Sequence, residues 1–379
     1  MTHPAPPVLR LLADDLTGAL DTAAELAALC GPVQVLWDGA ATQTLPPGSA
    51  ALDSGTREAT RDAAFERVRA LAPALAGAGI AYKKVDSLLR GHVAAELAAC
   101  LGLGAWRHCI LAPAFPAQGR ITRGGRLLVR QPGGDWSCPA GNGDLLAMLA
   151  AEDLPARKGS LGTPLPPGVS VFDAETEDDL ARLAALGRRA EAPVLWCGSG
   201  GLARGLAGAA TVRPTTILDP PVLGLFGSDQ PVTARQLAAC GPCWTRLGEG
   251  GGADVTARVA RQMDAAGVAL ASLDLPPGLA REDAARRIET AFTALLRRLP
   301  RPATLLAAGG ETLRALCRGL GAHALRATGL VAPGVPRSVM RGGAWDGVAV
   351  VSKSGAFGTD ALWRDLLAGN GLPIGSKQA

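Results

Sequence analysis

Short apolar runs alternate along the chain with longer stretches in which apolar residues recur every three or four positions. The short runs predict buried strands, and the longer spacing predicts helices that bury one face. In the first half, strands are predicted over 8–13, 32–37, 80–85, 108–112, 169–172 and 193–196, and helices over 18–29, 57–76, 91–101, 177–191 and 201–209. This alternation is typical of an α/β fold with a largely parallel sheet.

The alternation stops at RPTTILDPPV, near residues 212–221, where prolines accumulate without periodicity and indicate a linker. A second series follows, with strands predicted over 222–227, 268–273, 303–309, 328–332 and 347–351, and helices over 232–240, 253–266, 281–298, 311–320 and 358–368. Segment 119–167 is rich in Gly and Pro, and we expect a long irregular excursion there. We therefore predict two α/β domains with largely parallel sheets, residues 1–214 and 215–379, and a ligand cleft between them.

Composition narrows the class of protein. A chain of 379 residues with 48% hydrophobic content can fill two cores. The net charge is only +4 and the basic residues are scattered, so we expect no nucleic acid as a partner. We also expect no membrane partner, because the chain shows neither a secretory signal pattern nor an apolar run of membrane-spanning length. The eight dispersed cysteines suit reduced thiols, which predicts a cytoplasmic protein.

Charged and hydroxyl residues follow successive predicted strands in the first half. They are Asp14, Asp15, Arg57, Lys84, Asp86, Ser87, Arg90 and Arg120. Helix capping and internal salt bridges could account for any one of them. Open α/β sheets, however, bind ligands at the carboxyl ends of their strands. Acids and bases that recur at these ends indicate a small substrate with hydroxyl groups and a negative charge.

Glycines take the corresponding positions in the second half. The segments are GSD (227–229), GGET (309–312), APGVP (332–336) and KSGAFGTD (353–360). Glycines at strand-to-helix turns expose backbone N–H groups, and a helix N-terminus favours an anion. The sequence G-x-x-x-x-G-K-[ST] is absent, but Lys353, one of only five lysines, lies in the last segment. The set indicates a polyanionic ligand such as a nucleotide.

Taken together, the motifs resemble the four-carbon acid sugar kinase family, whose members phosphorylate erythronate, threonate or 3-oxo-tetronates with ATP. The matching elements are, in order, ADDLTGALDTA, KKVDSLLRG, APAFPAQGR, VFDAETEDDL, CGSGGLA, GGET, PGVP and KSGAFG. The resemblance implies an N-terminal domain for the acid sugar and a C-terminal domain for the nucleotide. The chain departs from the family pattern in the short segment LLVRQPGGDWSCPAGNG, at FGSDQ, and at Leu88, where a hydroxyl residue is common.

The resemblance also implies roles for single residues. It places Asp14, Asp15, Arg57, Asp86 and Arg90 in the sugar site, and Ser228, Gly309, Gly310, Glu311, Thr312, Ser354 and Gly355 in the ATP site. The strand-end chemistry adds Lys84, Ser87 and Arg120 to the first site and Lys353 to the second. We assign Arg57 and Arg90 to the substrate carboxylate, and Asp15 or Asp86 to deprotonation of the terminal hydroxyl.

The predicted protein is thus an ATP-dependent kinase, a transferase of carbohydrate metabolism that uses ATP with Mg²⁺. The ligands of the metal stay open. A homodimer is the assembly we consider, although the sequence does not fix the oligomeric state.

Two other functions stay open at this point. GSGGLARG (198–205) follows a predicted strand, and Asp219 lies at the distance of a ribose-binding acid, so an NAD-binding oxidoreductase is the rival enzyme. A non-catalytic acid-sugar sensor would need only the first set of residues. CGPC (240–243) copies a redox motif, but the predicted helix ends at Cys240, whereas redox chemistry needs that cysteine at a helix start.

Overall fold

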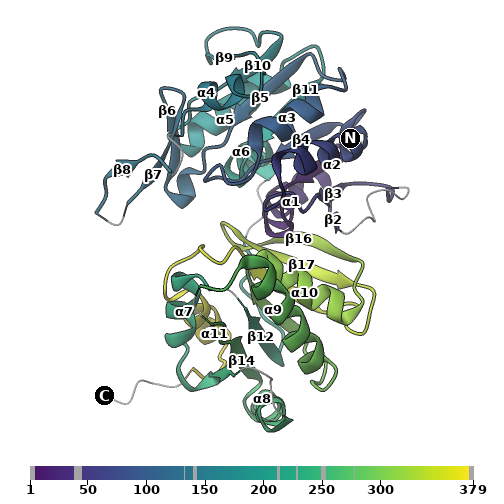
Figure 1. Cartoon of the computed structure of the whole chain (residues 1–379), viewed down its shortest axis with the longest axis vertical. Coiled ribbons are helices and arrows are strands. Elements are labelled where there is room, and N and C mark those ends of the chain that lie inside the picture. The colour runs from purple at the N-terminus through teal and green to yellow at the C-terminus, as the bar shows by residue number, and fades with distance from the viewer. Residues whose placement is uncertain are drawn as a thin grey trace. The chain divides into compact units, whose positions relative to one another are not determined.

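The computed structural model describes residues 5–37, 45–131, 133–139, 143–210, 214–227, 229–248, 253–276 and 278–374. The chain divides into two compact units, Met1–Val212 and Arg213–Ala379 (Figure 1). The boundary predicted after residue 214 falls two residues from this division. Each unit is an α/β structure, so the predicted fold class is confirmed.

The first unit is built on a parallel sheet. Among the described residues its strands lie in the order β2–β3–β1–β4–β11–β5–β10–β9, and each neighbouring pair is parallel. The bounds are β1 (Leu9–Ala13), β2 (Val33–Leu36), β3 (Ala50–Asp53), β4 (Ile80–Lys84), β5 (His108–Ala112), β9 (Ala156–Lys158), β10 (Gly168–Val171) and β11 (Val194–Gly198). The central strands are buried along almost their whole length, which explains their nearly continuous apolar runs.

Helices flank this sheet (Figure 1). They are α1 (Leu16–Cys30), α2 (Arg61–Leu71), α3 (Val93–Leu101), α4 (Leu145–Ala150), α5 (Glu177–Arg188) and α6 (Gly200–Ala207). Most begin at a polar side chain that accepts a first-turn backbone N–H; these caps are Asp15, Thr60, Asp144, Thr176 and Ser199. Because α2 begins at Arg61, the helix predicted from residue 57 starts too early, and Arg57 lies in the β3–α2 loop.

The prediction of an irregular excursion over 119–167 is wrong. Strands β6 (Arg120–Arg123), β7 (Arg126–Arg130) and β8 (Trp136–Ser137) form an antiparallel sheet, and α4 and β9 follow. Gly124 and Gly125 join β6 to β7 with φ of 62° and 77°, as a tight two-residue hairpin turn requires. The Gly-Gly pair between the two Arg-rich runs was therefore a hairpin signal.

The second unit combines parallel and antiparallel pairing. Its described strands lie in the order β13–β14–β12–β15–β18–β17–β16, parallel from β13 to β18 and antiparallel from β18 to β16. The strands are β12 (Val222–Phe226), β13 (Trp244–Leu247), β14 (Val268–Leu273), β15 (Thr304–Ala308), β16 (Ala324–Ala332), β17 (Val335–Arg341) and β18 (Ala349–Lys353). The helices are α7 (Pro231–Ala238), α8 (Ala253–Ala266), α9 (Arg281–Leu296), α10 (Gly310–Leu320) and α11 (Leu362–Gly369). APGVP was predicted at a strand-to-helix turn, but it joins β16 to β17 as a hairpin, with Gly334 at φ 75°.

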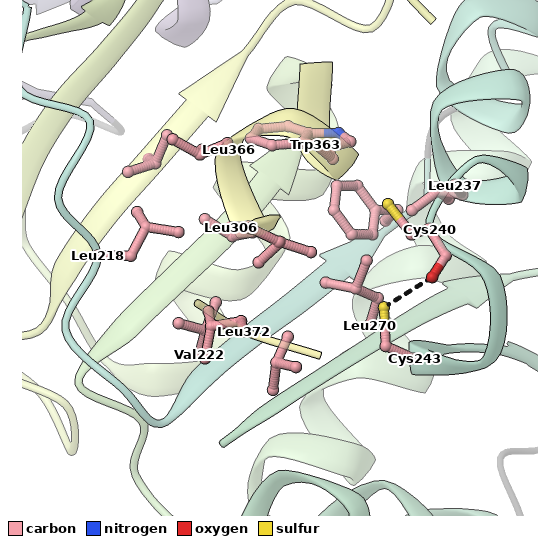
Figure 2. Close-up of a cluster of buried hydrophobic side chains, with 14 of the residues drawn as sticks. Leu218, Val222, Leu237, Cys240, Cys243, Leu270, Leu306, Trp363, Leu366 and Leu372 are labelled. Carbon is pink, nitrogen blue, oxygen red and sulfur yellow. Dashed lines mark hydrogen bonds between the residues drawn. The ribbon is translucent and has the colours of Figure 1, made fainter. Parts of the chain in front are cut away.

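One apolar cluster holds α7 and α11 on the sheet of the second unit. Figure 2 shows Leu237 of α7, and Cys240 just after this helix, in one cluster with Trp363 and Leu366 of α11 and strand residues such as Leu306. Figure 2 also shows that Cys240 and Cys243 of the CGPC segment belong to this cluster. The packing fixes the position of α7, which matters for the loop that follows β18.

The helices were compared with the length and apolarity that a membrane-spanning helix requires. Within the described ranges, no helix is long and apolar enough to cross a bilayer.

Candidate functional site

The strand ends of the first unit bring the predicted charged residues together. β1 pairs with β3 and β4 so that Ala13 lies opposite Asp53 and Leu12 opposite Lys83. The loops that follow these three strands therefore leave the same edge of the sheet. They carry Asp14 and Asp15, Arg57, and the segment 85–90 respectively.

Arg57 is the centre of this cluster. Its Nε and Nη2 donate to the two oxygens of Asp14 at 2.7 and 2.8 Å, and Nη1 lies 2.7 Å from Asp15 Oδ2. Nη2 also lies 3.6 Å from Asp86 Oδ1. One half-buried guanidinium thus holds three carboxylates that would otherwise repel one another.

These contacts separate the pKa values of the carboxyl groups. Burial raises the pKa of Asp14, although Arg57 opposes this shift. Burial acts in the same direction on Asp15, but the charges of Arg57 and Lys84 outweigh it and lower the pKa of that group. For Asp86, the hydrogen bonds from Arg90 and the charge of Arg57 outweigh burial, and they hold its pKa well below the ordinary range.

A tight turn after β4 pairs Asp86 with Arg90. Arg90 Nε and Nη2 donate to the Asp86 oxygens at 2.8 and 2.9 Å, and Asp86 Oδ2 also accepts from the backbone N–H groups of Leu88 and Arg90 at 3.2 Å. Leu89 between them has φ 59°, a left-handed conformation that is rare for a residue with a side chain. The Arg90 side chain is 43% exposed, whereas that of Arg57 is 12% exposed, so Arg90 is the guanidinium open to a ligand.

Asp15 both caps a helix and belongs to the cluster. Its Oδ1 accepts from the Gly18 N–H at 2.8 Å, and its Oδ2 accepts from Thr17 Oγ1 at 2.6 Å. A Cβ at Gly18 would lie 2.5 Å from Asp15 Oδ1 and 3.1 Å from Lys84 Nζ. Glycine at this position therefore leaves room for the Asp15 carboxylate and the Lys84 ammonium.

The remaining predicted residues of the first unit lie beside this cluster. Arg120 Nη1 donates to Ser87 Oγ at 2.7 Å, and both residues are buried. Lys84 Nζ donates to the carbonyl of Val85 at 2.9 Å. The bond between Arg120 and Ser87 joins the loop after β4 to the start of β6.

Beneath the cluster lies a buried ion pair that the sequence reasoning missed. Lys83 Nζ lies 2.7 Å from Glu96 Oε2, with both side chains at most 2% exposed, and Glu96 Oε1 accepts from Thr56 Oγ1 at 2.6 Å. Thr56 in turn donates its backbone N–H to the carbonyl of Asp14 at 3.0 Å. The pair therefore fixes the loop that carries Arg57. The adjacent Lys-Lys in KKVDS, one lysine on each face of a strand, was the available signal.

In the second unit, the carboxyl ends of three neighbouring parallel strands are in register. Phe226 of β12 lies opposite Ala308 of β15, which lies opposite Lys353 of β18. The segments that begin at Gly227, Gly309 and Ser354 consequently leave the sheet side by side. Ser228, predicted for the ATP site, lies outside the described residues.

The GGET segment forms the N-terminus of α10. Gly309 precedes the helix with φ 94° and donates its N–H to the carbonyl of Lys353 at 2.9 Å. Thr312 Oγ1 accepts from the Gly227 N–H at 3.2 Å, so this buried side chain joins two of the three loops. Gly310 is half-buried and Glu311 is exposed at the helix start, where free backbone N–H groups favour an anion.

Lys353 is completely buried, and within the described part of the chain its Nζ contacts oxygen atoms that carry no formal charge. Its Nζ donates to the carbonyls of Ser354 and Gly355 at 3.1 and 3.0 Å, and lies 3.4 Å from Thr233 Oγ1. Burial lowers the pKa of this ammonium to about 7. An ammonium held in this way would gain from a nearby anion.

Helix α7 supports the loop that follows Lys353. Thr233 Oγ1 donates to the Gly355 carbonyl at 2.9 Å, and Gln236 Nε2 donates to the carbonyls of Phe357 and Thr359 at 3.0 and 2.9 Å. Both side chains are buried, and Leu237 of the same helix belongs to the apolar cluster. The helix is thus anchored in the core and presents two polar side chains to the loop.

Neither rival motif has the geometry its function needs. Helix α7 ends at Ala238, so Cys240 follows a helix end, and it precedes only the single turn Gly241–Cys243. In GSGGLARG, a Cβ at Gly201 would lie 2.4 Å from the Ala114 carbonyl oxygen, and a Cβ at Gly205 would lie 2.7 Å from that of Leu180. These glycines allow α6 to pack closely on neighbouring backbone. Asp219 belongs to the second unit, whereas the motif belongs to the first.

The structure identifies no ligands for the predicted Mg²⁺. Among the described residues, no three His, Cys, Asp or Glu side chains are grouped as metal ligands.

Known proteins resemble the chain over most of its length. A D-threonate kinase of Cupriavidus necator is 37% identical to it, over 93% of this chain and 96% of that protein. The chain belongs to the four-carbon acid sugar kinase family. A D-threonate kinase of Bordetella bronchiseptica is 31% identical to this family member, over 93% of this chain and 95% of that protein.

Family models and a solved structure agree with this membership. A model described as a sugar-binding N-terminal domain matches residues 9–140, and one described as a nucleotide-binding C-terminal domain matches residues 223–362. The family resemblance read from the motifs is confirmed. A Salmonella typhimurium structure, 21% identical, covers 96% of this chain and 99% of its own with a TM-score of 0.73, and so shares the fold.

Proposed function

We propose that this family member is an ATP-dependent kinase that phosphorylates the terminal hydroxyl of a four-carbon acid sugar, with D-threonate as the first substrate to test. The observation that carries the proposal is the cluster of Asp14, Asp15 and Asp86 around Arg57. Carboxylates accept hydrogen bonds from sugar hydroxyls, and a guanidinium binds a carboxylate through two parallel hydrogen bonds. The curated relatives named as D-threonate kinases favour the same substrate class.

The geometry divides the work between the two arginines. Arg57 already donates to Asp14 and Asp15, so its role is to hold these acids in place. Arg90 is more exposed than Arg57, and its ion pair among the described residues is with Asp86, so it is our choice for the substrate carboxylate. Asp15 and Asp86 orient the hydroxyl groups as hydrogen-bond acceptors.

The second unit supplies the groups that suit a triphosphate. The N-terminal N–H groups of α10, the loop after β18 and the Lys353 ammonium present positive partial or full charges along one sheet edge. Phosphoryl transfer depends mainly on such positioning and charge stabilisation. Mg²⁺, when bound, would add charge neutralisation between the phosphates.

A coupled ADP-release assay over erythronate, threonate and 3-oxo-tetronate isomers tests the function. We expect ATP- and Mg²⁺-dependent ADP release with one or a few isomers, and no NAD(H) binding in a parallel titration. NAD(H) binding without ADP release would favour the oxidoreductase. Acid-sugar binding without ADP release would favour the sensor.

The variant Asp86→Asn tests the assignment of the site. We expect turnover to be abolished while ATP affinity, measured by calorimetry, stays close to that of the wild type. A comparable loss of ATP affinity would remove Asp86 from the sugar site.

A further inference from the structure

The turn that carries Arg57 is held at both ends by helix α3. The Ala59 N–H donates to the Thr56 carbonyl at 3.0 Å, so these two residues close a turn around Arg57. At the start of the turn, Thr56 Oγ1 donates to Glu96 Oε1 at 2.6 Å. At its end, the Ala59 carbonyl lies 2.6 Å from His92 Nε2. Because a carbonyl oxygen can only accept, His92 Nε2 carries the proton and donates it.

The two residues that hold the turn lie on one face of α3. His92 is at the N-cap position, and Glu96 follows one helical turn later, with its N–H donating to the His92 carbonyl at 2.9 Å. Glu96 is fixed in turn by Lys83, whose Nζ lies 2.7 Å from Glu96 Oε2 and donates to the Lys84 carbonyl at 2.9 Å. His92 and Glu96 thus form a two-point clamp on the turn, the α3 clamp.

The clamped turn also contacts the other loops of the sugar site. Thr56 and Arg57 donate their backbone N–H groups to the Asp14 carbonyl at 3.0 and 3.2 Å. A Cβ at Gly91 would lie 3.4 Å from Asp14 Oδ2 and 3.5 Å from Arg57 Cα. The segment that joins Arg90 to α3 therefore passes close to both residues.

The α3 clamp relates the two arginines of the site to each other. His92 follows Arg90 by two residues, and the same side chain holds the turn of Arg57. Asp86 contacts both guanidinium groups, Arg90 at 2.8 and 2.9 Å and Arg57 at 3.6 Å. Arg57 orients the acids proposed to accept from substrate hydroxyls, and Arg90 is our choice for the substrate carboxylate. The spacing of the two arginines should therefore decide which acid sugar fits.

We propose that His92 and Thr56 are positioning residues of the acid-sugar site. By fixing the turn of Arg57 relative to Arg90, they set the affinity for the acid sugar and the preference for a four-carbon chain. The inference rests on the proposed kinase function. Neither side chain has to touch the substrate, because a misplacement of about 1 Å in a site can by itself cost 10²-fold. An acid one carbon longer needs a wider spacing between the groups that bind its carboxylate and its hydroxyls.

Steady-state kinetics of the full-length variants His92→Leu and Thr56→Val test the α3 clamp. Each variant removes one hydrogen bond from the turn. We expect KM for D-threonate, or for the isomer that the ADP-release screen selects, to rise about tenfold, while KM for ATP stays within about threefold. The ratio of kcat/KM between this acid and its five-carbon homologue should fall about fivefold.

Conservative variants separate positioning from general loss of structure. Thr56→Ser keeps the hydroxyl group that donates to Glu96, and His92→Gln keeps an N–H donor for the Ala59 carbonyl. Both should recover most of the affinity and of the chain-length preference. A change of either property that the conservative variants share in full would contradict the proposal.

The matched control is His108→Leu. His108 Nδ1 lies 2.8 Å from the Pro166 carbonyl, so this variant also removes a bond between an imidazole and a carbonyl. His108 begins β5, at the amino end of the strand, whereas the sugar site lies at the carboxyl ends. The midpoint of thermal unfolding should fall as in His92→Leu, but KM for the acid sugar and the chain-length preference should stay unchanged. The α3 clamp is wrong if both properties stay within about twofold in His92→Leu and Thr56→Val, or if His108→Leu changes them equally.

Two further measurements need no turnover. Amide hydrogen exchange of Thr56, Arg57 and Ala59 should be faster in His92→Leu and Thr56→Val than in the wild type or His108→Leu. Calorimetry gives the affinity for D-threonate directly. If the wild type releases no ADP but this affinity falls in the two variants, the kinase proposal fails and the α3 clamp stands. If ADP is released and KM is unchanged in the variants, the α3 clamp fails and the kinase proposal stands. If no four-carbon acid binds to the wild type, both fail.

Discussion

The first unit gathers charged side chains at its strand ends, whereas the second unit gathers glycines and backbone N–H groups. In the first, Arg57, Asp14, Asp15 and Asp86 form a network of charge-assisted hydrogen bonds. In the second, Gly309 opens α10, and the buried ammonium of Lys353 rests on loop carbonyls. The carboxyl ends of the parallel strands thus carry charged side chains in one unit and glycines in the other. Side chains can select one arrangement of hydroxyl and carboxylate groups, while backbone groups suit the uniform charge of a phosphate chain.

The sharpest test of this contrast is removal of the Arg57 guanidinium. Arg57→Met leaves buried carboxylates without their counter-ion, which typically costs 3–5 kcal/mol, so we expect a loss of about that size in the free energy of unfolding and no measurable turnover. Arg57→Lys should recover part of the stability but not the two parallel hydrogen bonds. Urea unfolding and ADP release measure both effects.

The matched control for Arg57 is Arg61→Met. The Arg61 side chain is 52% exposed and pairs with Asp62 and Glu152 at the surface. Its removal should cost no more than about 1 kcal/mol and leave turnover intact. Equal losses in the two variants would show that the Arg57 network is no more than a surface-type ion pair.

A second test addresses the buried ammonium of Lys353 in the other unit. Lys353→Met should raise KM for ATP by about 10- to 100-fold, the loss of a hydrogen bond to a charged group, and leave KM for the acid sugar unchanged. An equal rise in both KM values would contradict the assignment of ATP binding to the second unit and acid-sugar binding to the first.

The same variant has a pH signature. The pKa of Lys353 is lowered from 10.5 to about 7, so between these values the unfolded chain binds more protons than the folded protein. Below pH 7, burying the charged Lys353 ammonium lowers the free energy of unfolding by its full amount. As pH rises toward 10.5, this free energy should increase by up to about 1.4 kcal/mol per pH unit in the wild type. Lys353→Met should lack this gain in urea titrations across the same range.

The smallest effect concerns Gln236, which supports the loop that follows β18. Gln236→Met removes the donor to Phe357 and Thr359 while keeping a similar volume in the core. We expect KM for ATP to rise by roughly fivefold, about the value of one hydrogen bond, with kcat nearly unchanged. Gln131→Met, which removes an exposed glutamine that follows β7 in the first unit, is the control and should change neither constant.

The positions of the strand ends could be predicted from the sequence because buried parallel strands appear as continuous apolar runs. Buried runs such as 108–112 and 268–273 match β5 and β14, and the residues that follow a parallel strand must lie at one edge. The convergence of Asp14, Arg57 and Asp86 follows from that rule. Their pairing does not, because a strand-end pattern cannot say which acid an arginine chooses.

Other features could not be predicted because they depend on contacts between distant segments. Lys83 and Glu96 lie on β4 and α3; the adjacent lysines 83 and 84 draw attention to Lys83, but no local pattern indicates that Glu96 is its buried partner. Asp21 and Glu25 read as ordinary polar positions of an amphipathic helix, yet α6 covers them. The hairpin in segment 119–167 was missed for a different reason: its strands are short and rich in Arg, so they lack the apolar signal of a core strand.

The left-handed backbone at Leu89 gives the turn after β4 a stored conformational cost of about 1 kcal/mol. The bonds between Asp86 and the 88–90 segment hold that shape in place. If a bound anion replaces Asp86 as the partner of the Arg90 guanidinium, the turn can relax. This relaxation would offset part of the free energy needed to separate Arg90 from Asp86. Recognition of the anion and a change in loop shape would then be one event rather than two.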